Sequence, residues 1–288
     1  MPDASEWAAV VVNYNAGPAL RDCVGSVLAQ EPRPEVVVVD NASTDGSVDG
    51  LRRAHPGVRI VHSGGNLGYA RAANVGIAAT GAPLVAVLNP DTVLRPGTAA
   101  ALTARFAAEG DLGAAGPRLC NADGSVYPSA RRVPSLIDAV GHGLLFFVWR
   151  DNPFTRRYRE IGADPDRRRD VDWVSGAAVW LRRAALDDVG GWDERYFMYV
   201  EDVDLCWRLH RAGWRVAYEP AGTVEHLLGV STAGRPYRMI AEHHRSLLRF
   251  AGVRFTGPRR ALLGPAAAFL AARGALAMAH HRLAAVRR

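Results

Sequence analysis

The densest group of ionisable side chains lies in the sequence GGWDERYFMYVEDVD, from Gly190 to Asp204. Five acids fall within twelve positions there, among Trp, Tyr, Phe and Met side chains. Charged runs on a solvated surface do not usually alternate with aromatic residues, whereas sugar-binding clefts do. A carboxylate that aromatic neighbours partly desolvate is suited to act as a general base. We therefore expect acid–base chemistry from this stretch.

The same acids also have a simpler structural explanation. Glu201, Asp202 and Asp204 fall at the start of a helix predicted over residues 203–212, where negative charge complements the helix dipole. Asp204 and Arg208 are spaced i, i+4, which favours an ordinary ion pair. Neither effect explains the aromatic residues, so the functional interpretation is favoured.

Polar residues follow the first two apolar runs of the chain. Asn13 and Asn15 come after residues 8–12, and Asp40 comes after residues 35–39. Asp40 could accept the N3–H of a uracil or thymine ring, the one donor on that edge of the base. Its alternative role is to cap the helix that follows.

The third apolar run, residues 84–88, leads into Asn89-Pro90-Asp91. Asp91 could bind Mg²⁺ or Mn²⁺, since these cations take carboxylate oxygens, and such an ion would neutralise charge on a diphosphate leaving group. A lone Asp after a strand is more often a turn residue. His226 could add a ring nitrogen to a metal site, although a single His is usually packed or on the surface.

The sequence GGNLGYARAAN, residues 64–74, is a glycine turn that opens a helix. Helix starts of this kind present free N–H groups to phosphate, and Arg71 would add positive charge. On the glycine spacing alone, a tight turn that needs positive φ is the favoured explanation.

An α/β sheet would position these candidates. Apolar runs of strand length alternate with segments of helical spacing, which is typical of a mostly parallel sheet flanked by helices. Ligands bind beyond the carboxyl ends of the strands in such sheets, and the polar residues above lie there. We predict strands at residues 8–12, 35–39, 58–61 and 84–88, and helices at residues 18–30, 45–55 and 66–80.

Several function classes are disfavoured by what the sequence lacks. No GxGxxG follows the first predicted strand, and a chain without Lys has no GxxxxGK[ST] loop, which argues against hydride-transfer enzymes and P-loop ATPases. The three cysteines are far apart and odd in number. They argue against a disulfide framework or a CxxC zinc site and suggest a reducing compartment.

Charge is unevenly distributed along the chain. All 35 basic side chains are Arg, against 29 acids, for a net charge of +6. Residues 235–288 contain 11 Arg and one acid, so a tail of +10 follows a body of −4. This distribution excludes a uniformly basic nucleic-acid coat, and we expect no nucleic-acid partner.

The basic tail is predicted to be helical. Residues 259–288, interrupted at Pro265, would lie on an anionic membrane; alternatively they pack on the body with a solvated basic face. Before them, residues 115–175 are loop-rich and carry five prolines and an aromatic run at 139–149. The sequence opens without a signal-peptide pattern, and no uninterrupted apolar run reaches the ~18 residues of a spanning helix. We therefore expect a cytoplasmic protein, peripheral at the inner face of the cell membrane.

Six segments together resemble the family 2 glycosyltransferases, the inverting enzymes of the GT-A fold. They occur in the family's order: VVNYN (11–15), VVDNASTDGS (38–47), GGNLGYARAANVGI (64–77), LNPD (88–91), SGAAVWLRRAAL (175–186) and GGWDERYFMYVEDVDLCWRLHRAGW (190–214). The added stretch DGSVYPSARRVPSL (123–136), with Asn152-Pro153, resembles an actinobacterial rhamnosyltransferase group of this family. That group acts on a polyprenyl-diphosphate-linked N-acetylglucosamine in cell-wall synthesis.

The resemblance implies inverting transfer of L-rhamnose from dTDP-rhamnose to that acceptor. Asp202 would deprotonate the acceptor hydroxyl, with Glu201 nearby and Asp204 as the reserve candidate. Asp91 would bind Mn²⁺ or Mg²⁺, and His226 would complete the metal's shell. The family's usual DxD is Asn89-Pro90-Asp91 here, and the loss of one carboxylate should weaken metal affinity.

The resemblance also divides the remaining candidates between the two substrates. Asp40, supported by the Asn13 region, would bind thymine, although uracil offers the same N3–H. The donor-binding set is Asn13, Asn15, Asp40, Asn66, Gly68, Arg71 and Asn89, and the acceptor-side set is Trp173, Trp192, Asp193 and Glu194. A GT-A domain would occupy residues 1–234, with a nucleotide-sugar half (1–95) and an acceptor and catalytic half (96–234), before a helical extension (235–288).

Three other functions stay open at this point. Galactofuranosyl transfer, or another rhamnosyl transfer to a cell-surface glycan, fits the same motifs. Nucleotidyl transfer onto a sugar phosphate typically needs a Gly-rich loop with Arg and Lys after the first strand, which this sequence lacks. A glycan-binding protein without activity is disfavoured by the intact Glu201-Asp202 pair.

Overall fold

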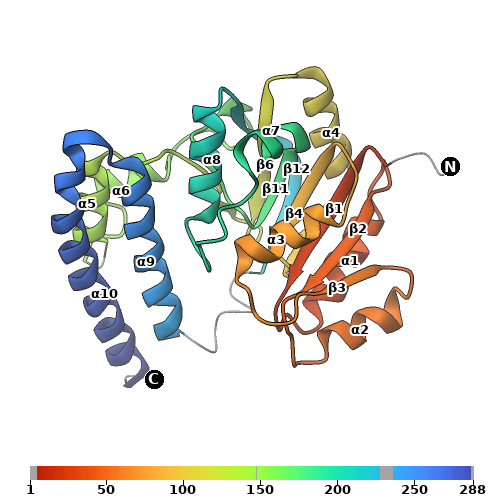
Figure 1. Cartoon of the computed structure of the whole chain (residues 1–288), viewed down its shortest axis with the longest axis horizontal. Coiled ribbons are helices and arrows are strands. Elements are labelled where there is room, and N and C mark those ends of the chain that lie inside the picture. Colours follow the sequence, from red (N-terminus) through yellow and green to blue (C-terminus); the bar gives the residue numbers. More distant parts are fainter. Residues whose placement is uncertain (1–4, 147, 228–235, 287–288) are drawn as a thin grey trace.

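The computed structural model describes residues 5–146, 148–227 and 236–286, and its centre is a ten-stranded mixed sheet. Eight strands follow the order β3-β2-β1-β4-β11-β6-β12-β5, with β7 beside β6 and β9 beside β12 (Figure 1). The strands are β1 (Trp7–Asn13), β2 (Glu35–Asp40), β3 (Arg59–His62), β4 (Leu84–Leu88), β5 (Thr92–Leu94), β6 (Leu112–Cys120), β7 (Val126–Tyr127), β9 (Arg169–Asp170), β11 (Ala178–Arg182) and β12 (Arg215–His226). A separate pair joins β8 (Ala130–Arg131) to β10 (Trp173–Val174).

The parallel strands β3, β2, β1 and β4 form one half of the sheet. Since side chains alternate between the faces of a strand, Val10 and Val12 pack on one face, and Ala9 and Val11 pack on the other. Helices cover both faces and bury these apolar runs. One face carries α1 (Ala19–Leu28), α2 (Ser47–Ala54) and α4 (Thr98–Ala108), and the other carries α3 (Tyr69–Ala78), α7 (Arg183–Val189) and α8 (Glu201–Arg211).

The other half of the sheet brings distant segments together. β11 runs antiparallel between β4 and β6, and β12 lies parallel to β6 and antiparallel to β5. In the β12–β5 register, His226 stands opposite Thr92. The backbone N–H of Leu227 donates to the carbonyl of Asp91 at 3.0 Å. The pairing of β12 with β5 therefore places His226 near Asp91, just after the end of β4, although the two residues are 135 positions apart in the sequence.

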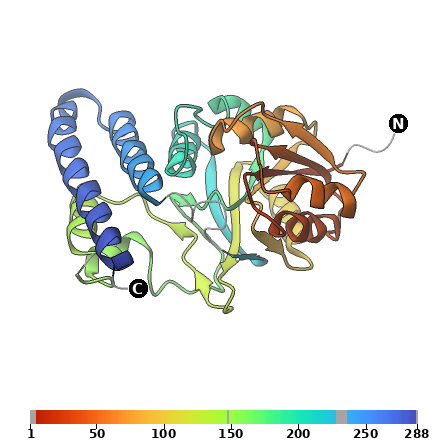
Figure 2. The ribbon, with the colours of Figure 1, turned by 90° about the horizontal axis from the view of Figure 1, so that it is seen from below.

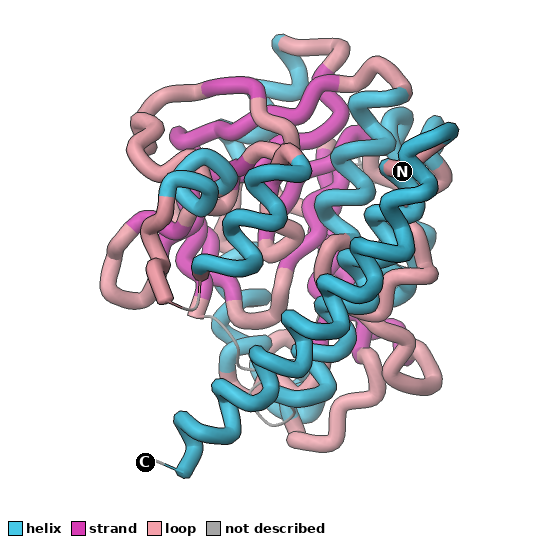
Figure 3. The backbone as a smooth tube through the Cα atoms, turned by 90° about the vertical axis from the view of Figure 1, so that its left-hand side faces the viewer, coloured by secondary structure: helices cyan, strands magenta, loops and turns pink. Residues whose placement is uncertain are grey.

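A helical layer stands beside the sheet. It contains α5 (Leu136–Leu145), α6 (Pro153–Tyr158), α9 (Pro236–Arg254), the 3₁₀ turn η1 (Gly257–Leu262) and α10 (Leu263–Val286). Figure 2 shows α9 and α10 side by side, and Figure 3 shows α10 running across the outside of this layer. The two helices are antiparallel, since Tyr237 stacks on His281 and His244 lies against Gly274. Phe250 of α9 packs on Trp207 of α8, which fastens the layer to the sheet domain.

Most predicted elements are confirmed, with ends shifted by a few residues. The α/β architecture with a mostly parallel sheet and a helical C-terminal segment is also confirmed. The predicted interruption at Pro265 is wrong, because Pro265 lies in the first turn of α10, where a missing N–H costs no helical hydrogen bond. Residues 115–175 contain more regular structure than expected, including α5 over much of the aromatic run.

Two further observations concern compartment and membrane. The three cysteines are all free thiols. Within the described residues one helix, Gly257–Leu283, is long and apolar enough by length and composition to cross a membrane, and little of it is buried. Arg and His residues interrupt its apolar sequence, so this helix contains no uninterrupted apolar run of spanning length.

Candidate active site

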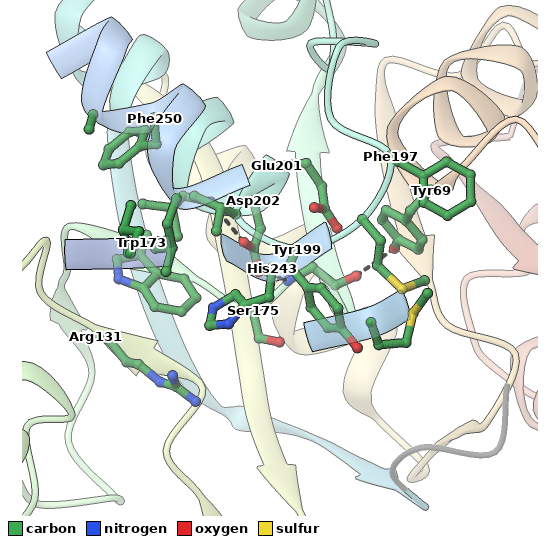
Figure 4. Close-up of a pocket in the computed structure, with 18 of the residues that line it drawn as sticks. Tyr69, Arg131, Trp173, Ser175, Phe197, Tyr199, Glu201, Asp202, His243 and Phe250 are labelled. Carbon is green, nitrogen blue, oxygen red and sulfur yellow. Dashed lines mark hydrogen bonds between the residues drawn. The ribbon is translucent and has the colours of Figure 1, made fainter. Parts of the chain in front are cut away.

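One cavity of about 1020 Å³ opens at the carboxyl ends of the parallel strands. Its lining includes the ends of β1, β2 and β4, the glycine turn, the start of α8, and faces of α5, α9 and α10. In the view of Figure 4, Glu201 and Asp202 lie between Trp173 on one side and Tyr69 on the other. We call the part that holds Asp91, Glu201, Asp202 and His226 the acidic end.

Asp91 and His226 meet at the floor of the acidic end. Their side chains are almost fully buried, and Oδ1 of Asp91 lies 3.3 Å from Nε2 of His226. The amide of Asn89 lies 3.3 Å from the same ring nitrogen. A carboxylate, an imidazole and an amide from three chain positions therefore converge, as the donor and metal assignments predicted.

Glu201 and Asp202 form the opposite wall, at the first turn of α8. Oδ2 of Asp202 accepts the backbone N–H of Gly176 at 2.9 Å, and Oδ1 accepts that of Val203 at 2.8 Å. Tyr199 and Val200, just before the helix, have φ values of 68° and 69°. This left-handed region is unfavourable for a β-branched residue such as Val200, and strain of this kind clusters at functional sites.

Burial controls the protonation of this acidic pair. It raises the pKa of Glu201 well above its ordinary value, and the neighbouring Asp202 carboxylate raises it further. Burial also raises the pKa of Asp202, opposed by the two backbone N–H groups and by the positive charge of Arg131. Because Asp202 has the stronger stabilisation of its charged form, Asp202 is the carboxyl of the pair that ionises first as the pH rises.

Replacing Glu201 by Gln is expected to stabilise the protein more at pH 8 than at pH 5. A glutamate whose pKa is raised by folding keeps its full stabilisation below its ordinary pKa of 4.5 and loses stability as the pH rises towards the folded pKa. Gln has no proton to lose. We expect the unfolding temperature of Glu201→Gln to exceed that of wild type by about 2–4 °C at pH 8.

The control for this measurement is Glu194→Gln, which changes a half-exposed glutamate. Its unfolding temperature is compared with that of wild type at the same two pH values. A difference for Glu201→Gln that stays constant or shrinks as the pH rises would contradict the raised pKa.

The glycine turn forms the side of the cavity nearest α3. Gly68 has φ of 84°, and a Cβ at this position would lie 2.4 Å from the carbonyl oxygen of Phe197, so only glycine fits. Asn66 accepts the N–H of Gly68 at 3.1 Å. Asn41 donates to Asn66 and to the carbonyl of Gly68, and it accepts the N–H of Leu67. Asn66 and Gly68 line the cavity as predicted, and Asn41 is the residue that shapes their turn.

Three predicted donor residues lie next to the cavity without lining it. Asp40 and Asn13 end neighbouring strands, and the amide of Asn13 contacts Ser43 and Ser47 at 3.0 Å. The carboxylate of Asp40 accepts the N–H of Ser43 and lies 3.1 Å from Nδ1 of His62. Asn15 accepts the N–H of Thr44 and so holds the same loop. A base that bound Asp40 would therefore approach a carboxylate that already holds these partners.

The four residues of the acceptor-side set do not lie together in the structure. Trp173 lines the cavity, and its indole N–H donates to the carbonyl of Arg132. Trp192 is buried against Tyr69, and Asp193 pairs with Arg195. Glu194 turns towards α3, where it pairs with Arg71 and accepts a hydrogen bond from Asn74. Of these, only Trp173 lines the cavity, and Arg71 is likewise outside it.

Asp204 also lies away from the cavity. Its Oδ2 is 2.7 Å from Nε of Arg208, which confirms the predicted helix pair, and its Oδ1 accepts the hydroxyl of Tyr196. Both oxygens therefore have structural partners, which favours Asp202 over the reserve candidate.

Comparisons with known proteins decide the family. A model of the family described as "Glycosyltransferase like family 2" matches residues 4–246. The chain belongs to this family. It is therefore a glycosyltransferase, and the resemblance found in its sequence motifs is confirmed.

Two relatives from Mycobacterium tuberculosis illustrate the range of similarity. The N-acetylglucosaminyl-diphospho-decaprenol L-rhamnosyltransferase is 40% identical over 284 residues, covering 94% of this chain and 91% of that protein. The pre-mycofactocin glycosyltransferase is 32% identical over 200 residues, covering 66% of this chain and 37% of that protein. The resemblance to the rhamnosyltransferase group is thus confirmed along nearly the whole transferase.

Solved structures support the GT-A fold. The mannosyltransferase of Pyrobaculum calidifontis, in complex with GDP-Man and Mn²⁺, has a TM-score of 0.61 at 20% identity and covers 98% of this chain and 76% of its own. GalNAc-T7, with UDP, GalNAc and Mn²⁺, has a TM-score of 0.64 at 16% identity and covers 88% of this chain and 48% of its own. Both of these similar folds hold a divalent metal together with a nucleotide.

The transferase offers two protein ligands that fit such a metal. Two ligand atoms bound about 2.1 Å from one ion in octahedral geometry lie ~3 Å apart, close to the separation of Asp91 and His226. Nδ1 of His226 is buried, with no partner in the described part of the chain. Among the described residues no group of three or more His, Cys, Asp or Glu side chains gathers. Diphosphate oxygens and water would therefore complete the coordination.

Sequence reasoning missed most of the lining residues of the transferase, and three of them lie close to the residues described above. Tyr69 donates its hydroxyl to the carbonyl of Gly176 at 2.6 Å, which links the glycine turn to the segment that orients Asp202. Asn41 was within a recognised motif but had no assigned role. Arg131 lies in the SARRVPSL stretch, where a charged residue among Tyr and Trp neighbours was the available signal.

Proposed function

We propose that this transferase moves L-rhamnose from dTDP-rhamnose to N-acetylglucosamine carried on a polyprenyl diphosphate, with inversion at the anomeric carbon. The observation that carries this proposal is the 40% identity with the L-rhamnosyltransferase over nearly the full length of both chains. The cavity supports it, because the carboxylate pair and the proposed metal-binding residues Asp91 and His226 line the same space as a long apolar wall.

The proposed mechanism assigns each residue one task. The ionised Asp202 takes the proton of the acceptor hydroxyl as that oxygen attacks the anomeric carbon. Gly176 and Val203 hold the carboxylate in place through their N–H groups. Asn66, which lines the cavity beside the N-terminus of α3, would contact the donor phosphates on the opposite side of the sugar. Attack and departure on opposite faces give inversion.

Asp91 and His226 would hold Mn²⁺ or Mg²⁺. The ion would supply positive charge to offset the charge that builds on the departing nucleoside diphosphate. With one carboxylate at this site, the affinity of the free protein for the ion should be low, and the donor diphosphate should raise it.

Donor identity is the first test. Thermal shifts with dTDP-rhamnose, UDP-sugars and GDP-mannose, each with Mn²⁺ or Mg²⁺, should be largest for dTDP-rhamnose with metal. Transfer to a polyprenyl-diphosphate-linked N-acetylglucosamine, followed by NMR of the new linkage, then tests acceptor and inversion. A larger shift and faster transfer with a UDP-sugar would favour galactofuranosyl or another transfer within the family.

We also propose peripheral contact of the helical layer with an anionic membrane. Large apolar side chains are exposed on α5 and α10, including Ile137, Leu144, Leu276 and Leu283. Arginines of the +10 tail lie on the same layer and would attract anionic head groups. Such a surface suits an enzyme whose acceptor is anchored in a membrane.

Vesicle flotation tests this contact. We expect the protein to float with anionic vesicles, less with zwitterionic vesicles, and less again when both Leu144 and Leu276 are replaced by Ser. Absence of flotation with anionic vesicles at low salt would rule the contact out.

A further inference from the structure

Another part of the cavity has the opposite charge to the acidic end. It is lined by Arg131 of β8, His142 of α5, His243 of α9 and Arg273 of α10, which we call the basic end. Four separate elements contribute these side chains, so the basic end is formed by the tertiary fold. Apart from the effect of the charge of Arg131 on the pKa of Asp202, the mechanism proposed above gives these side chains no role.

Arg131 is a buried cation without a carboxylate partner in the described part of the chain. Only 9% of the surface of this residue is exposed. Nε donates to the carbonyl of Pro128 at 2.6 Å, Nη2 donates to the hydroxyl of Tyr127 at 2.9 Å, and the guanidinium lies 5.0 Å from the ring of Trp173. A guanidinium is always charged, and buried charges are normally paired. An anionic ligand in the cavity would supply the missing charge.

Contacts through Tyr158 and through α5 connect Arg131 with His142 and Arg273. The guanidinium of Arg131 lies over Tyr158, whose ring is 5.3 Å from that of His142. Arg273 donates to the carbonyl of Gly143, the next residue along α5, and lies 2.9 Å from Nε2 of His244. Arg131 and Arg273 therefore approach the same turn of α5 from two sides.

Local electrostatics agree with an excess of positive charge. The pKa of His142 is lowered to about 4, mainly by burial and also by the positive charges of Arg273, Arg159 and Arg131. Burial lowers the pKa of His243 to about 3, with contributions from His244 and Arg273. The same field that opposes protonation of these rings attracts an anion.

Beyond the basic end the cavity wall is apolar. It continues between α5, α9 and α10 and is lined by Leu136, Val140, Leu247, Phe250, Phe269 and Leu270. A ligand that fits this part of the cavity combines an anionic group with a branched hydrocarbon chain.

We propose that the basic end binds the diphosphate of a polyprenyl diphosphate, with the first isoprene units along the apolar wall and the attached sugar facing Asp202. This inference rests on the proposed function and adds the residues that recognise the acceptor's lipid carrier. The two diphosphates of the reaction then occupy different sites: the donor's lies at Asp91 with a metal, and the acceptor's lies between Arg131 and Arg273 without one.

Farnesyl diphosphate is the probe for a direct binding test, with no metal and no donor present. Calorimetry should show binding to wild type, and about 10- to 100-fold weaker binding to Arg131→Gln and Arg273→Gln, the loss expected for one charge-assisted contact. Arg282→Gln is the matched control, because Arg282 is exposed on the same helix as Arg273 and outside the cavity lining; its affinity should equal that of wild type.

Inorganic pyrophosphate separates a lipid carrier from a free anion. It should bind the wild type at least tenfold more weakly than farnesyl diphosphate does, because it leaves the apolar wall empty. Equal affinity for the two probes would overturn the lipid assignment, and unchanged affinity for farnesyl diphosphate in both arginine variants would overturn the site.

Folding of the variants is checked by unfolding temperature and by affinity for the donor nucleotide. Arg131 packs against three aromatic rings, so Arg131→Gln could fail to fold; Arg273→Gln then decides alone. The binding test is independent of transfer. Binding through these arginines without rhamnosyl transfer would reject the proposed function and keep the site, whereas transfer with an unchanged acceptor KM in the variants would reject the site and keep the function.

Discussion

Asp202→Asn is expected to lower the rate of sugar transfer by about 10²- to 10⁴-fold, the usual contribution of a general base. Asn keeps the size of the side chain and can still accept the N–H of Gly176, so the first turn of α8 should be preserved. It cannot take the acceptor's proton. Affinity for the donor nucleotide, measured by calorimetry, should stay close to that of wild type because Asp202 lies on the acceptor side of the cavity.

Asp204→Asn provides the comparison for this result. It weakens a buried pair with Arg208 and should lower the unfolding temperature, while the folded fraction keeps turnover within about tenfold of wild type. If Asp204→Asn abolished transfer and Asp202→Asn did not, the base assignment would be reversed.

Asp91→Ala is expected to remove metal-dependent donor binding. Asp91 supplies the one carboxylate of the proposed metal site, and a neutral His226 alone should not hold Mn²⁺ at working concentrations. We expect a loss of about 10²- to 10³-fold in kcat/KM, comparable to removing one electrostatic contact to a developing charge. The measurement is nucleotide affinity with Mn²⁺ and with EDTA, where the difference seen for wild type should disappear.

Asp49→Ala is the control for Asp91→Ala, since Asp49 is exposed on α2. It should leave the Mn²⁺-dependent difference in nucleotide affinity unchanged. Persistence of that difference in Asp91→Ala would mean that other residues hold the metal.

The fold and the acidic end could be predicted because local sequence determines both. Apolar runs of strand length specify buried parallel strands, and the topology places whatever follows them at one edge of the sheet. The pattern singled out Asp91 as a candidate, although it favoured a turn residue there, and it favoured a functional role for the Glu201-Asp202 pair. His226 needed the family resemblance, since its place depends on the register between β12 and β5.

Some assigned residues do not line the cavity, and some lining residues were not assigned, because side-chain direction depends on tertiary contacts. Trp192 and Glu194 are close in sequence to the acidic pair, yet Asn74 of α3 binds the backbone of Trp192 and turns this segment away from the cavity. Arg131 joins the cavity only because β8 pairs with β10 across about 40 residues. Neither contact has a local sequence signal.

The helical layer has a consequence for how new acceptor specificities could arise. The match to the family as a whole ends at residue 246, within α9, whereas the similarity to the L-rhamnosyltransferase extends over 94% of the chain. Helix α10, with Arg273 and Phe269, therefore lies after the residues that the family model matches. The proposed metal and catalytic residues are encoded before this point and part of the proposed lipid site is encoded after it, so exchange of the 3′ portion could alter the choice of carrier without rebuilding the catalytic centre.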